Sequence, residues 1–211
     1  IGVFQLSKGK NRICGDCYDS FTDQHGHLYI ILSDGMGSGV SAMQESHAAL
    51  TLMAQGLRAG YTRAQALDVV NALMLMCTGR EMYATMDLCV VDLHTGEAAF
   101  EKLGACASYV VRDGEVRSIG SDTLPVGVLP DVEVKSLRMT LNEGDVVIMI
   151  TDGVIDSYPG GEEELQETVQ KCAWLHPKAV GERLIAGALE SGEARDDMAV
   201  LCARVVRTML H

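Results

Sequence analysis

Hydrophobic residues recur along most of the chain in short runs bounded by polar turns. Runs of about four to eight residues, rich in branched and aromatic side chains, are typical of β-strands. Such runs predict strands over Val3–Leu6, Tyr18–Phe21, Leu28–Leu32, Leu88–Leu93, Ala98–Leu103, Ala107–Arg112, Glu115–Ile119, Val132–Met139, Val146–Ile150 and Met198–Val206. No helical pattern interrupts residues 84–147, so we expect an antiparallel meander there.

Two pairs of segments show apolar residues at helical spacing instead. Ser41 before Gln44, and Thr62 before Gln65, match the capping box that opens a helix. The expected apolar faces of this first pair are Met43, His47, Leu50, Ala54 and Leu57, then Ala66, Val69, Val70, Leu73, Met74 and Cys77. Residues Glu162–Trp174 and Pro177–Leu189 predict a second pair of helices.

This order of elements favours one layered architecture. Two antiparallel sheets stacked face to face, with a helix pair outside each sheet, would bury every apolar face. We therefore predict an α+β fold of the αββα sandwich type. The chain shows no repeat, linker or low-complexity segment, so residues 1–211 are expected to form a single domain.

Composition narrows the class of protein. The apolar fraction of 47% is typical of a globular chain, and 17 basic against 29 acidic residues give a net charge of −12, which argues against a nucleic-acid surface. The seven cysteines lie mostly in apolar patterns, as in a reduced intracellular chain. Cys14 and Cys17 form a CxxC without a second pair at zinc spacing.

The termini and the hydropathy bear on localisation. No run of about 18 apolar residues occurs, so we expect no membrane contact by this segment. The chain begins at Ile1 without a signal-peptide pattern, and we expect it to be a fragment of a longer protein. The sequence leaves the oligomeric state open, a homodimer included.

Candidate chemistry lies in carboxylates at the ends of predicted strands. Asp34 follows one apolar run and Asp152 another, while Asp16 and Asp196 come just before strands. An isolated Asp-Gly pair is first of all a turn signal. If the strands lie side by side, however, the carboxylates converge and repel unless cations bind between them. Oxygen-only ligand sets suit Mg²⁺ or Mn²⁺, and two such ions can activate water for attack on phosphorus.

The spacing of these motifs resembles a known family. Gly15-Asp16-x-Tyr18, Ser33-Asp34-Gly35-Met36-Gly37-x-Gly39, Thr151-Asp152-Gly153 and Asp196-Asp197-Met198-x-Val200 occur in the order seen in metal-dependent serine/threonine phosphatases of the PPM (type 2C) class. Thr85-Met86-Asp87-Leu88, Leu103-Gly104 and Leu124-Pro125-Val126-Gly127 resemble the bacterial branch. Within it, the chain is most similar to the C-terminal phosphatase domains of the stage II sporulation protein E family.

That resemblance implies an αββα fold and two Mn²⁺ or Mg²⁺ ions. Asp34 would bridge both ions, the Gly35 carbonyl would bind one, and Asp152 and Asp196 would hold the other. Asp16 would bind metal or orient metal-bound water. Water activated by the two ions would hydrolyse phosphoserine on an anti-anti-sigma factor and so release a sporulation sigma factor. The domain would be cytoplasmic and its parent protein membrane-anchored.

Alternatives and neighbouring residues remain open at this point. A related PPM phosphatase could act on another phosphoprotein, or the fold could serve as a catalytically silent partner-binding domain. Asp19, Asp156 and Asp197 lie close in sequence to the candidate ligands and are expected to orient them or to form turns. The phosphate-binding arginine of eukaryotic relatives has no clear counterpart: Arg12 is close to Asp16 in sequence, but a solvated side chain is an equally good interpretation. His47 is expected to be packed.

Overall fold

The strands form two five-stranded antiparallel sheets. The computed structural model describes residues 1–8, 13–37, 39–76, 82–131 and 134–207. One sheet has the order β1 (Gly2–Leu6), β10 (Met198–Arg204), β9 (Val146–Ile150), β6 (Ser108–Arg112) and β7 (Glu115–Ile119). The other has the order β2 (Asp16–Thr22), β3 (His27–Asp34), β4 (Met86–Asp92), β5 (Glu97–Leu103) and β8 (Ser136–Thr140). The ladders are antiparallel, as predicted. The predicted meander over residues 84–147 is wrong, because the chain crosses between the sheets there: β4, β5 and β8 join one sheet, whereas β6, β7 and β9 join the other.

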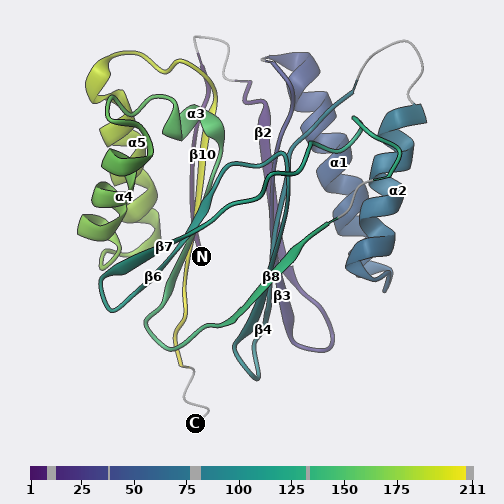
Figure 1. The fold of residues 1–211 in the computed structure, drawn as a ribbon, viewed down its shortest axis with the longest axis horizontal. Coiled ribbons are helices and arrows are strands. Elements are labelled where there is room, and N and C mark those ends of the chain that lie inside the picture. Colours follow the sequence, from purple (N-terminus) through teal and green to yellow (C-terminus); the bar gives the residue numbers. More distant parts are fainter. Residues whose placement is uncertain (9–12, 38, 77–81, 132–133, 208–211) are drawn as a thin grey trace.

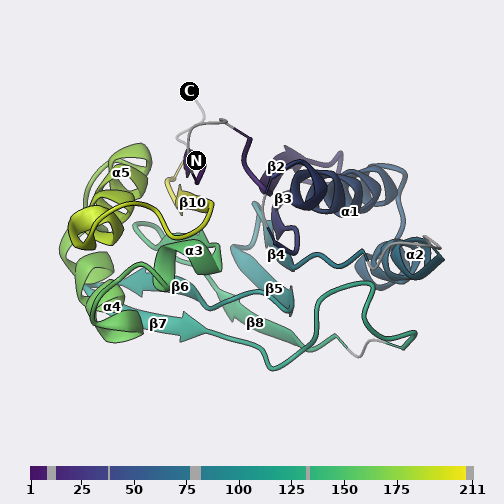
Figure 2. The same cartoon turned by 90° about the horizontal axis from the view of Figure 1, so that it is seen from above.

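Helices cover the outer face of each sheet. The β2-β3-β4-β5-β8 sheet carries α1 (Val40–Arg58) and α2 (Arg63–Met76), at the right of Figure 1. The other sheet carries α4 (Gly161–Cys172) and α5 (Pro177–Ala188), with the short helices α3 (Asp152–Ile155) and η1 (Leu189–Ser191) beside them. Seen from above, helices, sheet, sheet and helices form successive layers (Figure 2). The predicted αββα sandwich of the α+β class is confirmed.

The core is divided into three layers by the alternation of side chains along each strand. Leu32 and Cys89 face the opposite sheet, whereas Ile31 and Leu88, one residue earlier on their strands, face α1 and α2. Successive strand residues point to opposite faces, so a strand covered on both sides must be apolar at both sets of positions. This explains why the central strands read as continuous apolar runs rather than alternating ones.

One of the two predicted capping boxes forms. The Thr62 amide donates to Gln65 Oε1 (3.0 Å) and the Gln65 amide donates to Thr62 Oγ1 (3.3 Å), so α2 opens as predicted. The box at Ser41 is wrong, because α1 already begins at Val40 with Gly39 as its N-cap and no side-chain cap. The Ser41 hydroxyl lies inside the helix and donates to Glu45 Oε1 instead (3.2 Å).

The predicted packing faces of the first helix pair are partly wrong. His47 is exposed rather than packed, because α1 turns Ala42, Ser46 and Ala49 toward the sheet. Those small or polar residues carry little hydropathy signal, yet they let the helix approach the strands closely. On α2, Val69 and Leu73 are 40% and 41% exposed, although periodicity placed them on the apolar face. The predicted contact of Cys77 lies outside the described residues.

Two further differences concern element boundaries. The strand predicted over Val132–Met139 is β8, which the structure gives as Ser136–Thr140. Helix α3 was not predicted, because four residues directly after a strand give no periodicity to detect. Within the described part of the chain, no helix is long and apolar enough to cross a lipid bilayer.

Candidate metal centre

Asp16 and Asp34 lie directly opposite each other on adjacent strands. Asp16 begins β2 and Asp34 ends β3, and the antiparallel register pairs the two residues. Side chains in such a pair have Cβ atoms about 4.5–5.5 Å apart, so their carboxyl groups meet. Asp16 is only 3% exposed, whereas Asp34 is partly exposed. The two carboxylates at the open end of the β2-β3 hairpin therefore share one end of the sandwich.

Threonine hydroxyls and amides fix this pair in place. Thr151 Oγ1 donates to Asp16 Oδ2 (2.8 Å) and accepts from the Ala199 amide (2.9 Å). The Asp34 amide donates to Thr85 Oγ1 (2.9 Å), and the Thr85 amide donates to the Asp34 carbonyl (2.8 Å). Asp16 Oδ1 is buried and has no hydrogen-bond partner among the described residues. One oxygen of Asp16 is thus held by the protein while the other remains free to bind a ligand.

Asp152 and Asp196 come from the opposite sheet. Asp152 is the first residue of α3, immediately after β9, and Asp196 precedes β10. A Cβ atom added at Gly153 would lie 2.0 Å from the Asp197 carbonyl oxygen and 3.2 Å from Asp196 Cβ, so the two segments are in close contact. Figure 1 shows α3 and the start of β2 at the same end of the sandwich. Asp152 is exposed and Asp196 partly buried, so both lie at the rim above Asp16.

The pKa values of three of these carboxyl groups reflect their clustering. Burial, and then the Asp16 carboxylate, raises the pKa of Asp34 far above the ordinary carboxyl range. Burial also raises the pKa of Asp16, against hydrogen bonds from Asp34 and Thr151 that lower it. Although Asp152 as a residue is exposed, partial desolvation of its carboxyl group and then the neighbouring Asp156 raise its pKa. Without a cation, these groups tend to keep a proton rather than collect negative charge.

The residues at this end of the sandwich fit divalent cations. One buried carboxylate oxygen has no hydrogen-bond partner in the described ranges, and several carboxyl groups have raised pKa values. Both features are expected of a site whose oxygen ligands bind a cation. In the described ranges, no three His, Cys, Asp or Glu side chains already stand in metal-ligand geometry. Binding of one ion by several of these carboxylates would therefore require some of their side chains to change rotamer.

Gly35 lies where no side chain fits. A Cβ atom there would come within 1.9 Å of the Ala42 carbonyl oxygen, in the first turns of α1. The glycine thus allows the backbone after Asp34 to pass directly beneath the helix. Next to it, a narrow cavity of about 20 Å³ is lined by Asp34, Asp152 and the turn at residues 104–106.

The other acidic residues named from the sequence have partners of their own or lie in solvent. Asp197 accepts from the Lys8 and Gly15 amides (2.6 Å each), so it ties the N-terminal segment to the site. Asp19 accepts from Arg58 of α1 (2.7 Å). Asp156 is exposed next to Asp152.

Three remaining candidates were also named from the sequence. Cys14 and Cys17 are free thiols, and burial raises the pKa of both. Arg12 lies outside the described residues.

Sequence reasoning did not single out the two threonines. Thr85 and Thr151 appeared only as parts of family motifs, yet their hydroxyls orient Asp34 and Asp16. The available signal was position, since Thr151 directly precedes Asp152. A threonine beside a candidate ligand at a strand end is a natural hydrogen-bond partner for a carboxylate.

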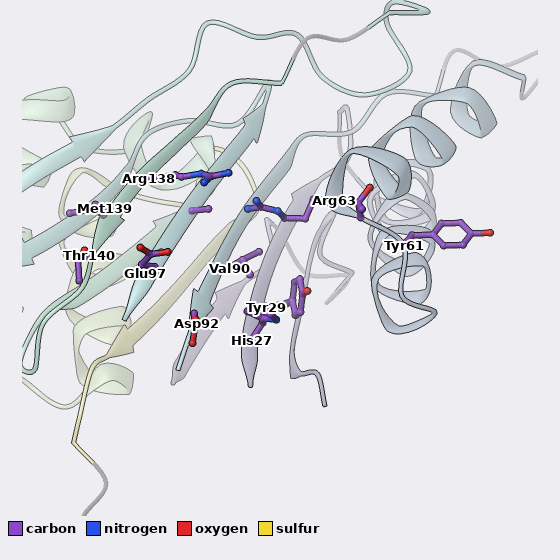
Figure 3. Close-up of a pocket in the computed structure, with 13 residues that line it drawn as sticks. His27, Tyr29, Tyr61, Arg63, Val90, Asp92, Glu97, Arg138, Met139 and Thr140 are labelled. Carbon is purple, nitrogen blue, oxygen red and sulfur yellow. The ribbon is translucent and has the colours of Figure 1, made fainter. Parts of the chain in front are cut away.

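A wide cavity elsewhere on the molecule has different chemistry. It measures about 670 Å³ and lies over the outer face of the β2-β3-β4-β5-β8 sheet, beside the start of α2 (Figure 3). Figure 3 shows Arg63 and Arg138 on its two sides, with Asp92 and Glu97 below. Asp92 and Glu97 are at the strand ends remote from Asp34. Cavity size therefore does not identify the candidate centre, whereas the convergence of carboxylates does.

Comparison with known proteins agrees with this geometry. The sequence profile of the family described as stage II sporulation protein E (SpoIIE) matches residues 24–206. The chain belongs to the stage II sporulation protein E family. The stage II sporulation protein E of Priestia megaterium is 28% identical over 209 residues, and that of Bacillus subtilis (strain 168) is 26% identical over 209 residues. The match covers 97% of this chain but only 36% and 25% of those two proteins.

The fold agrees with the family assignment. The structure of the PP2C phosphatase domain and a fragment of the regulatory domain of SpoIIE from Bacillus subtilis superposes with a TM-score of 0.87 at 26% identity. The superposition covers 97% of this chain and 62% of that one. This member of the SpoIIE family is therefore homologous to PP2C-class serine phosphatase domains, and the family resemblance read from the motifs is confirmed.

Proposed function

We propose that this chain is a metal-dependent serine phosphatase domain. Its substrate would be phosphoserine on an anti-anti-sigma factor, and its action would release a sporulation sigma factor. The observation that supports the proposal is the electrostatic interaction of Asp34 with Asp16, Asp152 and Asp196, next to a buried oxygen of Asp16 that has no hydrogen-bond partner in the described part of the chain. Two Mn²⁺ or Mg²⁺ ions would neutralise the negative charge of such a cluster better than a single basic side chain could.

The ligand assignment is the one that the family resemblance implies for these motif positions. Asp34, between Asp16 on one side and Asp152 on the other, is suited to bridge two ions, with the Gly35 carbonyl as a further ligand. Asp152 and Asp196 would bind the second ion. Two bound cations would supply charge neutralisation on a phosphoryl group and a lowered pKa of coordinated water.

The chain's own residues prepare this chemistry. Thr151 holds one oxygen of Asp16 and so turns the other toward the site. Thr85 fixes the backbone of Asp34 at both its amide and its carbonyl. Groups that are already held in place reorganise less during a reaction, and preorganisation of this kind lowers an activation barrier. Here it applies to Asp16 and to the backbone of Asp34. The exposed rim at Asp152 leaves room for a phosphorylated segment of a protein to approach.

Context beyond this chain is part of the same proposal. We infer that residues 1–211 act as one cytoplasmic domain of a longer, membrane-anchored parent, and that this domain contacts neither membrane nor nucleic acid itself. The net charge of −12 supports the absence of a nucleic-acid partner. A homodimer remains a prediction.

Hydrolysis of a chromogenic phosphate ester tests the activity. We expect turnover that requires Mn²⁺ or Mg²⁺, is abolished by EDTA, and is lost in Asp34→Ala and Asp152→Ala. Asp68→Ala, at an exposed carboxylate of α2, is the control and is expected to keep full activity. Metal binding without hydrolysis in the wild-type chain would favour a silent, partner-binding domain instead.

A second experiment identifies the substrate. Candidate phosphorylated anti-anti-sigma proteins are presented to the wild-type chain and release of phosphate is followed. Hydrolysis of the small ester but of none of these proteins would favour the alternative, a related phosphatase that acts on another phosphoprotein.

A further inference from the structure

A buried lysine lies beneath the candidate metal centre, in the space between the two sheets. The Lys102 side chain on β5 is only 2% exposed. Its ammonium donates to Asp87 Oδ2 on β4 (2.5 Å), to the Cys106 carbonyl (2.7 Å) and to Ser108 Oγ on β6 (2.9 Å). Ser108 in turn donates to the same Asp87 oxygen (2.7 Å). All three ammonium hydrogens are thus used, and they join strands of both sheets.

This network adjoins the carboxylate cluster. Asp87 pairs in register with Leu32, two residues before Asp34. Cys106 belongs to the turn that lines the narrow cavity together with Asp34 and Asp152. The Cys106 thiol donates to the Ile150 carbonyl at the end of β9 (2.9 Å), two residues before Asp152. A chain of hydrogen bonds therefore runs from Lys102 through the turn to the segment that carries Asp152.

The turn is also held on its far side. The Gly104 amide donates to the Thr123 carbonyl (3.0 Å), and Thr123 Oγ1 donates to the Lys102 carbonyl (2.6 Å). Gly104 has φ 63°, and a Cβ atom there would meet the Pro125 ring at 2.4 Å. Only glycine fits this conformation and this contact. The turn is therefore placed by contacts on both sides rather than by its own sequence preferences.

Stability alone does not account for this arrangement. A buried ion pair loses the hydration of both charges, and replacing it by apolar residues of similar size is often neutral or stabilising. Asp87 Oδ1 is buried without a hydrogen-bond partner in the described ranges, so the hydration that Asp87 loses on burial is only partly replaced by hydrogen bonds. A polar network of this kind is better explained by the geometry that it imposes.

We propose that Lys102 is a positioning residue for the metal centre: it fixes the turn at Cys106 and, through the Cys106 thiol, sets the place of Asp152 relative to Asp34. The inference rests on the proposed function, since it assigns a role toward cations bound by those two carboxylates. Burial raises the pKa of the Cys106 thiol well above its ordinary value, so the thiol keeps the proton that it donates to Ile150.

The Cys106 link is tested by direct measurement of Mn²⁺ binding, for example from the electron paramagnetic resonance signal of free Mn²⁺. Cys106→Ala removes the donor and is expected to weaken Mn²⁺ binding by about 10-fold or more, as loss of groups that orient metal ligands does. Cys106→Ser keeps a donor and is expected to recover most of the affinity. Cys89→Ala is the control, because it deletes a buried inter-sheet thiol of β4 that lies outside the turn at residues 104–106.

The ion pair itself is tested by the double substitution Lys102→Met with Asp87→Leu, which leaves no unpaired buried charge. We expect a folded protein with a melting temperature near that of the wild type but Mn²⁺ binding weakened by about 10- to 100-fold. If the double variant does not fold, the comparison of Cys106→Ala with Cys106→Ser and Cys89→Ala tests the proposal.

Unchanged Mn²⁺ affinity in folded Cys106→Ala, or an equal loss in Cys89→Ala, would overturn the proposal. Failure of the wild-type chain to bind Mn²⁺ would overturn the proposed function instead, so the two failures are distinguishable.

Discussion

The clustering of carboxylates predicts that removing one of them stabilises the metal-free protein. Asp34→Asn keeps the shape of the side chain and its capacity to hydrogen-bond Asp16, but it removes one negative charge. Asp34 is the best position for this test because its pKa is raised most, by burial and then by Asp16, Asp152 and Asp196. A group whose ionisation the fold opposes destabilises the native state when it is charged.

The size of the effect follows from the geometry of the strand pair. Two unit charges about 4 Å apart interact with about 4 kcal/mol at an effective dielectric constant of about 20. Partial exposure of Asp34 to solvent and retention of a proton both reduce this value. We therefore expect Asp34→Asn to add about 1–3 kcal/mol to the free energy of unfolding near neutral pH without metal. For a chain of this size, each kcal/mol raises the melting temperature by about 2–4 °C.

Thermal melts in EDTA and in Mn²⁺ measure both sides of this balance. In EDTA the variant should melt higher than the wild type, while Asp68→Asn, at an exposed carboxylate of α2, should not change the melting temperature. In Mn²⁺ the order should reverse, because an ion that binds only the native state stabilises the wild type more than the variant. A variant that melts no higher than the wild type in EDTA would refute the reasoning.

Further predictions concern pH, backbone and ligand orientation. The pKa values of Asp16, Asp34 and Asp152 in the folded protein lie above the unfolded value of about 4, so the native state binds more protons than the unfolded state. The stability of the metal-free protein should therefore fall as the pH rises above that value. Urea unfolding at about pH 5 and about pH 8 checks the direction of this change. Gly35→Ala would bring a Cβ atom to 1.9 Å from Ala42 O and should destabilise by about 1–3 kcal/mol in urea unfolding, whereas Gly120→Ala, which meets nothing within 4 Å, should change stability by less than about 0.5 kcal/mol. Thr151→Val removes the hydroxyl bound to Asp16 and should lower Mn²⁺-dependent ester hydrolysis by about 10- to 100-fold, and wild-type rates at saturating Mn²⁺ would contradict this.

The architecture could be predicted because it depends on patterns that are local in the chain. Apolar runs bounded by turns located the strands, and the Thr62–Gln65 capping box located the start of α2. Ser41 and Gln44 carry the same pattern without forming a box, because Gly39 already begins α1 and the helix packs against the sheet from its first turn. A local signal fails where tertiary contacts set the boundary.

Within the site, the sequence by itself singled out the candidate residues. Asp16, Asp34, Asp152 and Asp196 stood at strand ends, and their motifs indicated the family. The roles of these residues as metal ligands remain a proposal that the Mn²⁺ experiments test.

Only the tertiary structure decided which groups hold those carboxylates in place. Register pairs Asp16 with Asp34, and Thr151 reaches Asp16 from the other sheet across 135 positions of chain. The Lys102 network likewise joins strands that no local pattern connects. Hydropathy reports whether a side chain is buried, but the partner of a buried polar group depends on which strands become neighbours, and that is a property of the whole fold.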